Sequence, residues 1–533
     1  MTDVVIVGSG PGGVNAAAPL VAAGRQVLLL DYGNEDRRYA ALIPHRPFSE
    51  LRRTDGEQHR YFLGDRFEGI PLGPVRVGAQ LTPPRMHILA DAAERMPVRA
   101  DGFAASMSLA RGGLGAGWSA GVFPFAGDEL RAMGLGLGDL RPHYDAVAER
   151  IGVCGAGDDL EPFLPPSPSM LPPLELDSSA EVVLARYQRR RAALNAAGFF
   201  LGRTRLAVCT ERHRERGPYA YLDLDYWADM DRSVYRPQWT LEELLRAPNF
   251  TYLNRRFVRT FREDERGVRV HATRADTGEE ESHDAAALVL AGGTLGTVRI
   301  VLASLGAYDR PVPVLCNAYT YVPTLNLGML GRPARDRRSS LAQLTALLRI
   351  PGDPGRIVQA QLFSYRSLLT FKLMKESPLA YREGLRLLRL LIPKFAILGI
   401  HHEDRPTAGK CCTLRRASAG PDLLEITYHP SDAETKLQQA DERTLLRCFR
   451  RLGCLPLRSM RPGHGSSLHY AGTFPIAPEG GPFTCDRDSR LRATRAVYLA
   501  DGSVFPWIPP KGLTFNLMAN ADRVGTLLAR KPG

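Results

Sequence analysis

The sequence is poor in lysine, and its few cysteines are widely scattered. Lysine occurs only at residues 372, 375, 394, 410, 436, 511 and 531, so arginine supplies nearly all of the positive charge behind the net charge of +12. The eight cysteines form no C-x-x-C pair and no dense cluster, which excludes a small disulfide-stapled scaffold. The adjacent Cys411 and Cys412 would close a strained ring if they were bridged, so we expect free thiols.

Long hydrophobic runs are also missing. The longest strongly apolar runs are about a dozen residues, whereas a membrane-spanning helix needs about 20. A strand pattern begins at about residue 3 and leaves no room for a signal peptide. These features predict a cytoplasmic protein, and attachment to the periphery of a membrane is the alternative.

Nucleic-acid-binding motifs are absent, and no stretch interleaves aromatic with basic residues, which excludes nucleic acid as a partner. The positive charge suits an acidic partner such as a phosphorylated substrate, a carrier protein or an anionic membrane surface. We favour the alternative that the arginines are solvated surface charges.

The length and composition predict a globular protein of two domains. A chain of 533 residues is too long for one ordinary hydrophobic core. Its 44% hydrophobic and 24% charged residues are ordinary for a soluble globular protein.

The N-terminal residues predict a dinucleotide-binding turn between a strand and a helix. Residues 3–7 have a buried-strand pattern, and Gly8, Gly10 and Gly13 follow in G-x-G-x-x-G spacing. Gly8 permits a tight turn, Gly10 lets the backbone approach a pyrophosphate, and Gly13 lets the helix pack closely on the strand. The amides at the helix N-terminus then face the phosphates.

A second strand pattern at residues 26–30 ends in Asp31. An acidic residue about 20 residues beyond the glycines suits hydrogen bonds to a ribose hydroxyl. The structural alternative is a glycine-rich turn without a ligand, and the motif does not distinguish FAD from NAD.

The middle of the chain predicts further strands that lead into a second glycine turn. The strand patterns cover residues 250–253, 257–261, 268–273 and 285–290. A helix then follows Gly292-Gly293 and extends to about Ser304.

Three C-terminal segments match, in order, the motifs of a known family. Residues 469–473 (HYAGT) resemble H-x-x-G-T, residues 501–506 (DGSVFP) match D-G-S-x-x-P, and residues 513–521 (LTFNLMANA) resemble N-P-T-x-T-I-M-A-x-A. With the N-terminal glycines, these segments make the chain resemble the glucose–methanol–choline family of FAD-dependent oxidoreductases. Residues 111–118 (RGGLGAGW) are similar to the family's Gly-Gly loop beside the flavin.

The resemblance implies an α/β fold with two domains and FAD as the cofactor, without a metal. A discontinuous, Rossmann-like FAD-binding domain is expected over residues 1–125, 201–312 and 461–533. An α+β substrate-binding domain with a mixed or antiparallel sheet is expected over residues 126–200 and 313–460.

The resemblance also implies which residues contact FAD. These are Gly8, Gly10, Gly13, Asp31, Gly112, Gly113, Trp118, Val258, Asp501 and Gly502. Trp118 stands where the family commonly has a small or amide residue, so it either stacks near the isoalloxazine or fills the core.

The family oxidises alcohols: a base removes the hydroxyl proton while a hydride passes to flavin N5. His469 falls at the position of that base. Histidine suits the role because its ordinary pKa is close to working pH. The structural alternative is a core histidine packed beneath the flavin.

The second catalytic position departs from the family pattern. Members usually carry a histidine or asparagine there, hydrogen-bonded to the substrate oxygen, but this chain has Gly512. Lys511 and Asn516 are the nearby residues that could compensate. Loss of one electrostatic donor in such a site costs about 100- to 1,000-fold in rate.

The region expected to choose the substrate contains a basic amphipathic stretch, residues 368–400. Pro378 and Pro393 divide it, and arginines 382, 386 and 389 lie opposite its apolar positions. The apolar residues that recur near helical spacing are Leu369, Leu373, Leu385, Leu388, Leu391, Ile392, Phe395 and Leu398. Such a stretch can lie on a membrane or take up a lipid-like substrate, but we favour a lid helix packed on a sheet. The following cluster, residues 401–404 (HHED), suits a strand-end turn better than a metal site.

Two further helices, at residues 181–197 and 440–452, are rich in arginine. They could meet a phosphate or a carrier protein, but a solvated helix face is the default interpretation.

The sequence therefore predicts an FAD-dependent oxidoreductase acting on the hydroxyl group of a large, rather apolar small-molecule or lipid-like substrate, such as a biosynthetic intermediate. One alternative is a flavin enzyme that performs a desaturation, isomerisation or cyclisation, because the second catalytic position is glycine. The other is a non-catalytic flavin-fold protein that binds a partner at a membrane.

Overall fold

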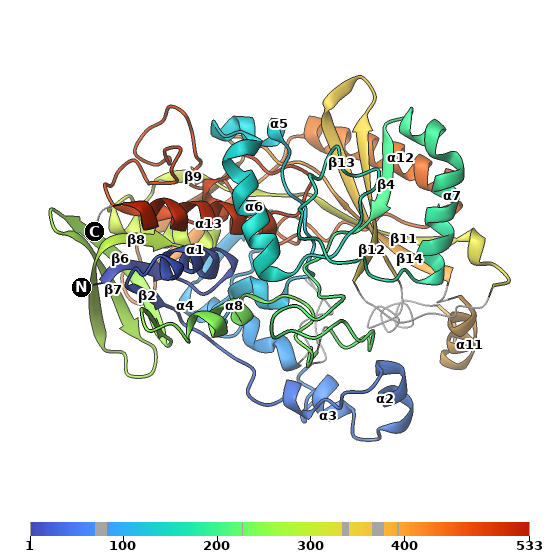
Figure 1. The fold of residues 1–533 in the computed structure, drawn as a ribbon, viewed down its shortest axis with the longest axis horizontal. Helices are drawn as coiled ribbons and strands as arrows, with labels where there is room; N and C mark the ends of the chain where they lie inside the picture. The colour runs from blue at the N-terminus through green and yellow to red at the C-terminus, as the bar shows by residue number, and fades with distance from the viewer. Residues whose placement is uncertain are drawn as a thin grey trace.

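The computed structural model of the protein describes residues 2–69, 83–225, 227–332, 341–364, 378–391 and 394–531. Two large sheets lie toward opposite ends of the molecule, and both chain termini lie beside the first sheet (Figure 1). Helix α6 (Leu137–Ile151) lies between the two ends in this view.

The first sheet has a parallel part and an antiparallel extension. Its strand order is β5-β2-β1-β8-β7-β6, and β19 also pairs with β8. Strands β5, β2, β1, β8 and β19 are mutually parallel, whereas β7 is antiparallel to both β8 and β6. The bounds are β1 Thr2–Val7, β2 Val27–Leu30, β5 Phe250–Leu253, β6 Arg256–Asp264, β7 Gly267–Arg274, β8 Glu280–Leu290 and β19 Val497–Leu499.

Helices cover the parallel strands because these strands are apolar on both faces. Residues 4–7 of β1 are all buried, as is every residue of β2. Helix α1 (Pro11–Ala22) follows β1 and packs against the C-terminal helix α13 (Thr514–Arg530). Helix α9 (Thr294–Ser304) follows β8.

The structure confirms the elements predicted over residues 3–30 and 250–304. Most ends differ by no more than three residues, but β8 begins at Glu280 rather than Ala285. The difference arises because the first half of β8 pairs with β7 and the second half with β1 and β19. The sequence pattern marked only the second half, in which every residue except Ala286 is buried.

The second sheet is antiparallel and has six strands in the order β17-β11-β14-β13-β12-β4. The bounds are β4 Phe199–Arg203, β11 Tyr319–Asn326, β12 Ala342–Ile350, β13 Asp353–Ser364, β14 Phe395–His401 and β17 Cys454–Pro456. Strand β4 crosses the expected boundary between residues 200 and 201, because it pairs with β12.

The two faces of this six-stranded sheet differ in polarity. Val322, Leu398 and Leu362 are opposite one another on β11, β14 and β13, and all three belong to one buried apolar cluster. Helices α7 (Ser178–Asn195) and α12 (Asp432–Arg451) contribute to the same cluster. Because strand side chains alternate between faces, the neighbouring positions Tyr321 and Gln361 lie on the other face.

Smaller elements complete the fold. A four-stranded sheet has the order β3-β16-β15-β9, and β10 pairs with β18. Their bounds are β3 Val98–Asp101, β9 Pro311–Pro313, β10 Leu315–Cys316, β15 Lys410–Arg415, β16 Leu423–Tyr428 and β18 Tyr470–Ala471. The short helices α2 (Phe48–Thr54) and α3 (His59–Phe62) project from one side (Figure 1).

The expected amphipathic stretch at residues 368–400 is only partly helical. Helix α11 covers Tyr381–Leu391, residues 368–377 lie outside the described part, and residues 395–401 form β14. Assigning Phe395 and Leu398 to a helical face was wrong. A short apolar run fits both periods, and the pairing of β14 with β11 and β13 decides for the strand. The arginine-rich helices are confirmed as α7 and α12.

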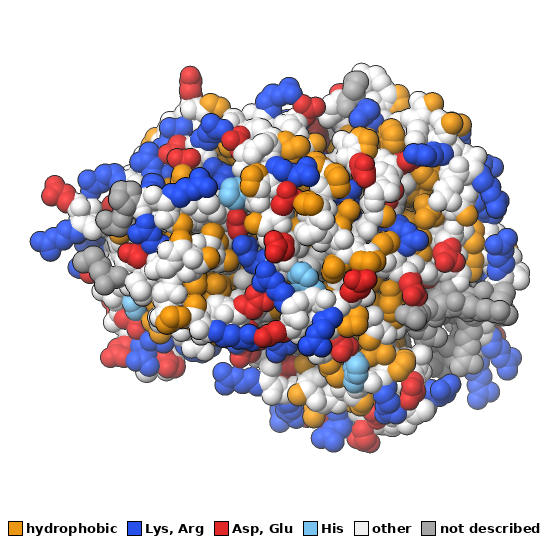
Figure 2. Space-filling view, viewed as in Figure 1, with side chains coloured by type: hydrophobic (Ala, Val, Ile, Leu, Met, Phe, Trp, Pro, Cys, Tyr) orange, Lys and Arg blue, Asp and Glu red, His pale blue; other side chains and the backbone are white. Residues whose placement is uncertain are grey.

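Positive and negative side chains are intermingled on the face of the molecule seen in Figure 2. Several exposed arginines are paired with acidic residues, as in Arg246–Glu215 and Arg269–Asp284. Within the described residues, no helix is both long and apolar enough to cross a membrane.

A buried lysine holds the end of β14 against the four-stranded sheet. The ammonium of Lys410, at the start of β15, is 2.5 Å from Asp404 Oδ1 and 2.7 Å from Glu434 Oε1. Asp404 Oδ2 also accepts hydrogen bonds from the Tyr428 hydroxyl at 2.6 Å and the Cys316 amide at 2.7 Å. The backbone of Asp404 pairs with Ile508, so this network fixes residues 401–404 beside residues 508–512.

We expect Lys410→Met to lower the free energy of unfolding by about 3 to 5 kcal/mol, because it leaves the Asp404 carboxylate buried without its cation. Urea unfolding at pH 7 measures the change. Arg269→Ala is the matched control, since it breaks an exposed pair with Asp284 and should leave the unfolding midpoint unchanged. Equal effects of both substitutions would contradict the assignment.

Candidate functional site

A cavity of about 810 Å³ extends from the carboxyl ends of β1 and β2 to the six-stranded sheet. This volume is in the upper part of the range for ligand pockets, which is about 300 to 1,000 Å³. Segments far apart in sequence line it: the first glycine turn, residues 106–119, the start of α9, the six-stranded sheet, and residues near 469, 501 and 512.

The first glycine turn combines close packing with an open position. A Cβ on Gly12 would lie 1.9 Å from the carbonyl oxygen of Ala500, and one on Gly13 would lie 1.8 Å from that of Gly8. A Cβ on Gly10 would meet only the Gly112 carbonyl oxygen, at 3.9 Å, and Gly10 lines the cavity. The turn thus brings bare backbone and the N-terminus of α1 to the cavity wall.

Asp31 lies at the end of β2, on the cavity wall, as the sequence predicts. Its Oδ2 accepts hydrogen bonds from the Ser9 hydroxyl and, at 3.1 Å, from the Tyr252 hydroxyl. Burial raises the pKa of the Asp31 carboxyl to about 6, against these hydrogen bonds, which lower it. The carboxylate is therefore mostly ionised at neutral pH.

Sequence reasoning missed Ser9, which joins the two glycine loops. Its hydroxyl donates to Asp31 and accepts a hydrogen bond of 2.9 Å from the Gly112 amide. Gly112 is therefore a bridge to the first turn rather than part of the cavity wall, where Gly113 lies. The hydroxyl residue inside the glycine motif was the available signal.

The remaining expected cofactor residues are placed as follows. Trp118 and Val258 line the cavity, and the Trp118 ring meets Tyr235 edge-on. Asp501 lines it too, and its carboxylate accepts hydrogen bonds from the Thr297 hydroxyl and the Ser503 amide.

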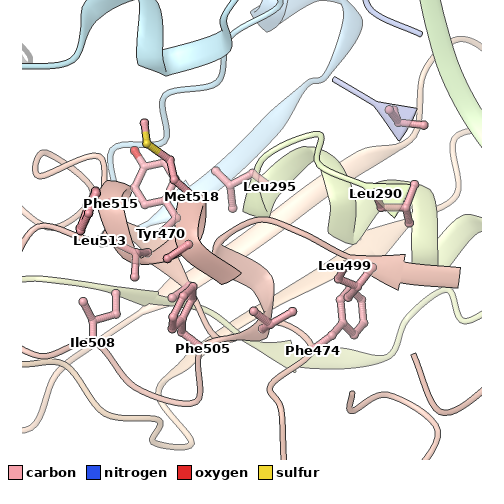
Figure 3. Packing of buried hydrophobic residues seen from close by; sticks show 14 of the residues in the cluster. Leu290, Leu295, Tyr470, Phe474, Leu499, Phe505, Ile508, Leu513, Phe515 and Met518 are labelled. Atoms are coloured by element: carbon pink, nitrogen blue, oxygen red, sulfur yellow. The ribbon is translucent and has the colours of Figure 1, made fainter. Parts of the chain in front are cut away.

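Gly502 lies against the strand β18. A Cβ at Gly502 would lie 2.1 Å from the Tyr470 carbonyl oxygen, so glycine is required for the DGS turn to reach the strand beside His469. Apolar side chains anchor this part of the chain (Figure 3). They include Leu290, Leu295, Tyr470, Phe474, Leu499, Phe505, Ile508, Leu513, Phe515 and Met518.

His469 is half-buried and lines the cavity with a defined tautomer. The Asn317 amide nitrogen donates to the carbonyl oxygens of His402, at 2.6 Å, and Pro509, at 3.0 Å. The amide oxygen of Asn317 therefore faces His469 Nδ1, at 3.2 Å, and Nδ1 carries the proton. Nε2 keeps its lone pair, and no described residue hydrogen-bonds it. Burial lowers the pKa of His469 to about 4, so the ring is neutral at neutral pH.

Lys511 does not compensate for the glycine at 512. Its ammonium is fully buried and donates to Glu129 Oε2 at 2.6 Å and to the carbonyl oxygens of Phe163 and Pro124 at 2.7 and 3.3 Å. All three hydrogens are engaged, and the residue is not part of the cavity wall. Its catalytic assignment is therefore replaced by a structural one.

Asn516 is also structural. Its amide oxygen accepts from the Phe125 amide at 2.8 Å and the Tyr144 hydroxyl at 2.7 Å, and its nitrogen donates to the carbonyl oxygens of Phe123 and Gly512. A side chain with four hydrogen bonds has none left for a substrate, and Asn516 does not line the cavity.

Gly512 itself lines the cavity beside His469 and Phe123. A Cβ there would lie 3.1 Å from the Phe123 ring and 3.9 Å from His469 Cε1. Phe123 thus occupies space into which a larger side chain at 512 would project.

The wall opposite the glycine turns comes from the six-stranded sheet, and sequence reasoning missed it. Its aromatic and polar members are Tyr319, Tyr321, Gln361, Phe363, Ser364 and His401. The period-two spacing of tyrosine at 319 and 321 and of glutamine at 359 and 361 was the available signal.

The HHED cluster does not gather around one point. His401 lines the cavity, whereas Asp404 is bound by Lys410 and the His402 side chain lies outside the cavity wall. Over the described ranges, no group of three or more His, Cys, Asp or Glu side chains could hold a metal ion.

Comparison with known proteins shows the fold. No protein-family model and no curated protein matches the sequence. The structure is similar to pyridoxine 4-oxidase from Mesorbium loti, with a TM-score of 0.57 and 14% identity over 100% of both chains. It is also similar to a mutant of formate oxidase from Aspergillus oryzae RIB40, with a TM-score of 0.59 and 12% identity over 99% of this chain and 98% of that chain.

A third similar structure is an FAD-dependent oxidoreductase from Chaetomium thermophilum, with a TM-score of 0.58 and 13% identity over 99% of both chains. At these identities the likeness establishes the fold along the whole chain. It confirms the predicted class, a mixed α/β protein with several sheets.

We expect Gly12→Ala to lower the free energy of unfolding by about 3 kcal/mol, because its Cβ would overlap the Ala500 carbonyl oxygen and force the backbone apart. Gly10→Ala is the matched control, since its Cβ enters open cavity space and should leave stability unchanged. Thermal unfolding of the two variants measures the difference. A stable Gly12→Ala protein would show that the two segments are not packed as described.

Proposed function

We propose that the protein is an FAD-dependent oxidoreductase of the glucose–methanol–choline type that oxidises a CH–OH group. The observation that carries the proposal is His469. Its Nε2 lone pair is available on the wall of a large cavity whose other end is a glycine-rich nucleotide cradle. The similar fold of two structures that are described with FAD supports it.

The residues present are suited to FAD. The parallel sheet, the bare backbone at Gly10 and the N-terminus of α1 form a Rossmann-like cradle for a pyrophosphate. Asp31 would accept a hydrogen bond from a ribose hydroxyl. Farther along the cavity, the cofactor would be held by Gly113, Val258 and the turn at 501–502. Ser9 would hold the two glycine loops together through its hydrogen bond with the Gly112 amide.

When bound, FAD supplies a two-electron acceptor that takes the hydride from the substrate carbon. His469 accepts the hydroxyl proton at Nε2, so the carbon–oxygen single bond can become a carbonyl. The Asn317 amide oxygen holds the ring through Nδ1–H and stabilises the imidazolium that forms. The low pKa of His469 keeps the base unprotonated before each turnover.

The residues of the cavity wall indicate which kind of substrate would fit. Tyrosine, phenylalanine and tryptophan rings face the cavity, together with the Gln361 amide and several hydroxyls. This mixture suits a large substrate with an apolar or aromatic body and a primary or secondary hydroxyl. The similar structures include enzymes for pyridoxine and for formate by name, so they do not choose between substrates.

A second candidate keeps FAD but changes the reaction to desaturation, isomerisation or cyclisation. The absence of a side-chain donor at Gly512 favours it. It predicts that no alcohol reduces the enzyme under anaerobic conditions.

The purified protein should be yellow and release FAD, and an alcohol substrate should bleach the flavin under anaerobic conditions. A stopped-flow screen with pyridoxine, benzyl alcohol and a long-chain primary alcohol tests this reaction. His469→Ala should retain FAD but be reduced about 100- to 10,000-fold more slowly, because the proton acceptor is lost. A colourless protein that cannot be reconstituted would contradict the proposal, and a His469→Ala protein reduced at the normal rate would contradict the base assignment.

The low pKa of His469 gives a distinctive pH profile. Because a pKa of about 4 keeps the base neutral above that pH, kcat/KM should stay level from pH 8 to about 5 and fall only below it. An unperturbed histidine would instead lose activity near pH 6.5. Steady-state rates in overlapping buffers distinguish the two, and an inflection near pH 6.5 would show that the base is not the buried ring.

A further inference from the structure

One cavity residue, His401 on β14, faces His469 from the opposite wall. We propose, building on the oxidoreductase function above, that His401 is a second catalytic residue: its Nε2–H donates a hydrogen bond to the substrate hydroxyl oxygen whose proton goes to His469. It takes the place of the side chain that position 512 lacks. Nothing in the HHED sequence pattern indicates this role.

The register of the six-stranded sheet brings His401 to this place. His401 is the last residue of β14, and it is opposite Tyr319 on β11 and Gln359 on β13. It shares the cavity-facing side with Tyr319, whose ring centroid is 4.4 Å from that of His401. The Lys410 network fixes the residues that follow His401 beside the loop that carries Gly512.

The two histidines are close enough to share one oxygen atom. Their ring centroids are 5.5 Å apart, and the ring planes are 33° from parallel. Hydrogen bonds of about 2.8 Å from one oxygen to both rings require the two ring nitrogens to be no more than about 5.6 Å apart, which rings at this centroid separation allow. A hydroxyl between the rings would donate to one and accept from the other.

The surroundings of the two histidine rings favour a proton on Nδ1 of His469 and on Nε2 of His401. Asn317 places the proton of His469 on Nδ1, which leaves Nε2 as an acceptor. His401 is 8% exposed, and its Nδ1 is enclosed without a hydrogen-bond partner among the described residues. An enclosed N–H without an acceptor is costly, so the proton of the neutral ring belongs on Nε2, toward the cavity.

Position 512 cannot supply this donor without rearrangement. A Cβ there would already be 3.1 Å from the Phe123 ring, which is buried. Neither Lys511 nor Asn516 has a free hydrogen-bonding group. Among the described residues of the cavity wall, the His401 ring is the one that pairs with the His469 ring.

The chemistry balances with the two rings in separate roles. The O–H bond breaks and its proton moves to His469 Nε2, the C–H bond breaks and its hydride passes to FAD, and a C=O bond forms. His401 transfers nothing. Its N–H stabilises the negative charge that develops on the oxygen as the proton leaves.

The test measures anaerobic flavin reduction by benzyl alcohol, or by the alcohol from the screen that reduces the wild-type holoenzyme fastest. His401→Ala should keep FAD at the wild-type ratio but be reduced about 100- to 1,000-fold more slowly. His401→Asn, which keeps an N–H donor, should recover part of the rate. His213→Gln is the matched control, because His213 is partly buried and hydrogen-bonds the Glu149 carbonyl oxygen but does not line the cavity, and it should leave the rate unchanged.

A second readout does not depend on turnover. In the holoenzyme labelled with ¹⁵N-histidine, the spectrum should show His401 protonated at Nε2 and His469 at Nδ1, with assignments from the His401→Asn and His469→Ala proteins. Added benzyl alcohol should shift both signals. A His401→Ala rate equal to wild type, a proton on His401 Nδ1, or a His401 signal unmoved by the alcohol would each overturn the proposal.

The two readouts separate this proposal from the proposed function. A holoenzyme that no alcohol reduces would contradict alcohol oxidation, while the ¹⁵N spectrum would still decide whether His401 presents its N–H to a hydroxyl beside His469.

Discussion

The cavity depends on direct contact between backbones that are far apart in sequence. Gly12 packs against the carbonyl oxygen of Ala500, and Gly502 packs against that of Tyr470. Both contacts are so close that a Cβ on either glycine would overlap the oxygen. These contacts bind the first turn of the chain to its last strand and that strand to the histidine segment. Gly12, Asp501 and Gly502 line the cavity at these contacts, so this part of its wall forms only when both ends of the chain have folded.

The opposite wall is built by a different interaction. The six-stranded sheet is anchored at the end of β14 by the buried charge of Lys410, which holds Asp404 and, through it, the loop at residues 508–512. The two walls therefore meet at the histidine pair. The His469 ring is oriented by the side-chain amide of Asn317, which precedes β11. The His401 ring belongs to β14 of the six-stranded sheet itself.

The glycine-turn end of the cavity could be predicted from the sequence because its signals are local. Strand, glycine spacing and strand-end acid stand within 31 residues, and the structure places Gly8, Gly10 and Asp31 on one wall. Lys511 and Asn516 could not be placed, because their hydrogen bonds reach residues more than 340 positions away. His401 was hidden for the same reason: a strand's partners and the face it turns to a ligand are set by long-range pairing rather than by neighbouring residues.

Side chains alternate between the two faces of the six-stranded sheet, so the residues that stabilise the core differ from those that line the cavity. Val322, Leu398 and Leu362 hold the hydrophobic core, while the positions between them contact whatever enters the cavity. Substitutions at the cavity-facing positions can change shape and hydrogen bonding without opening a void in the core. The same framework can therefore acquire a new specificity through single substitutions that cost little stability.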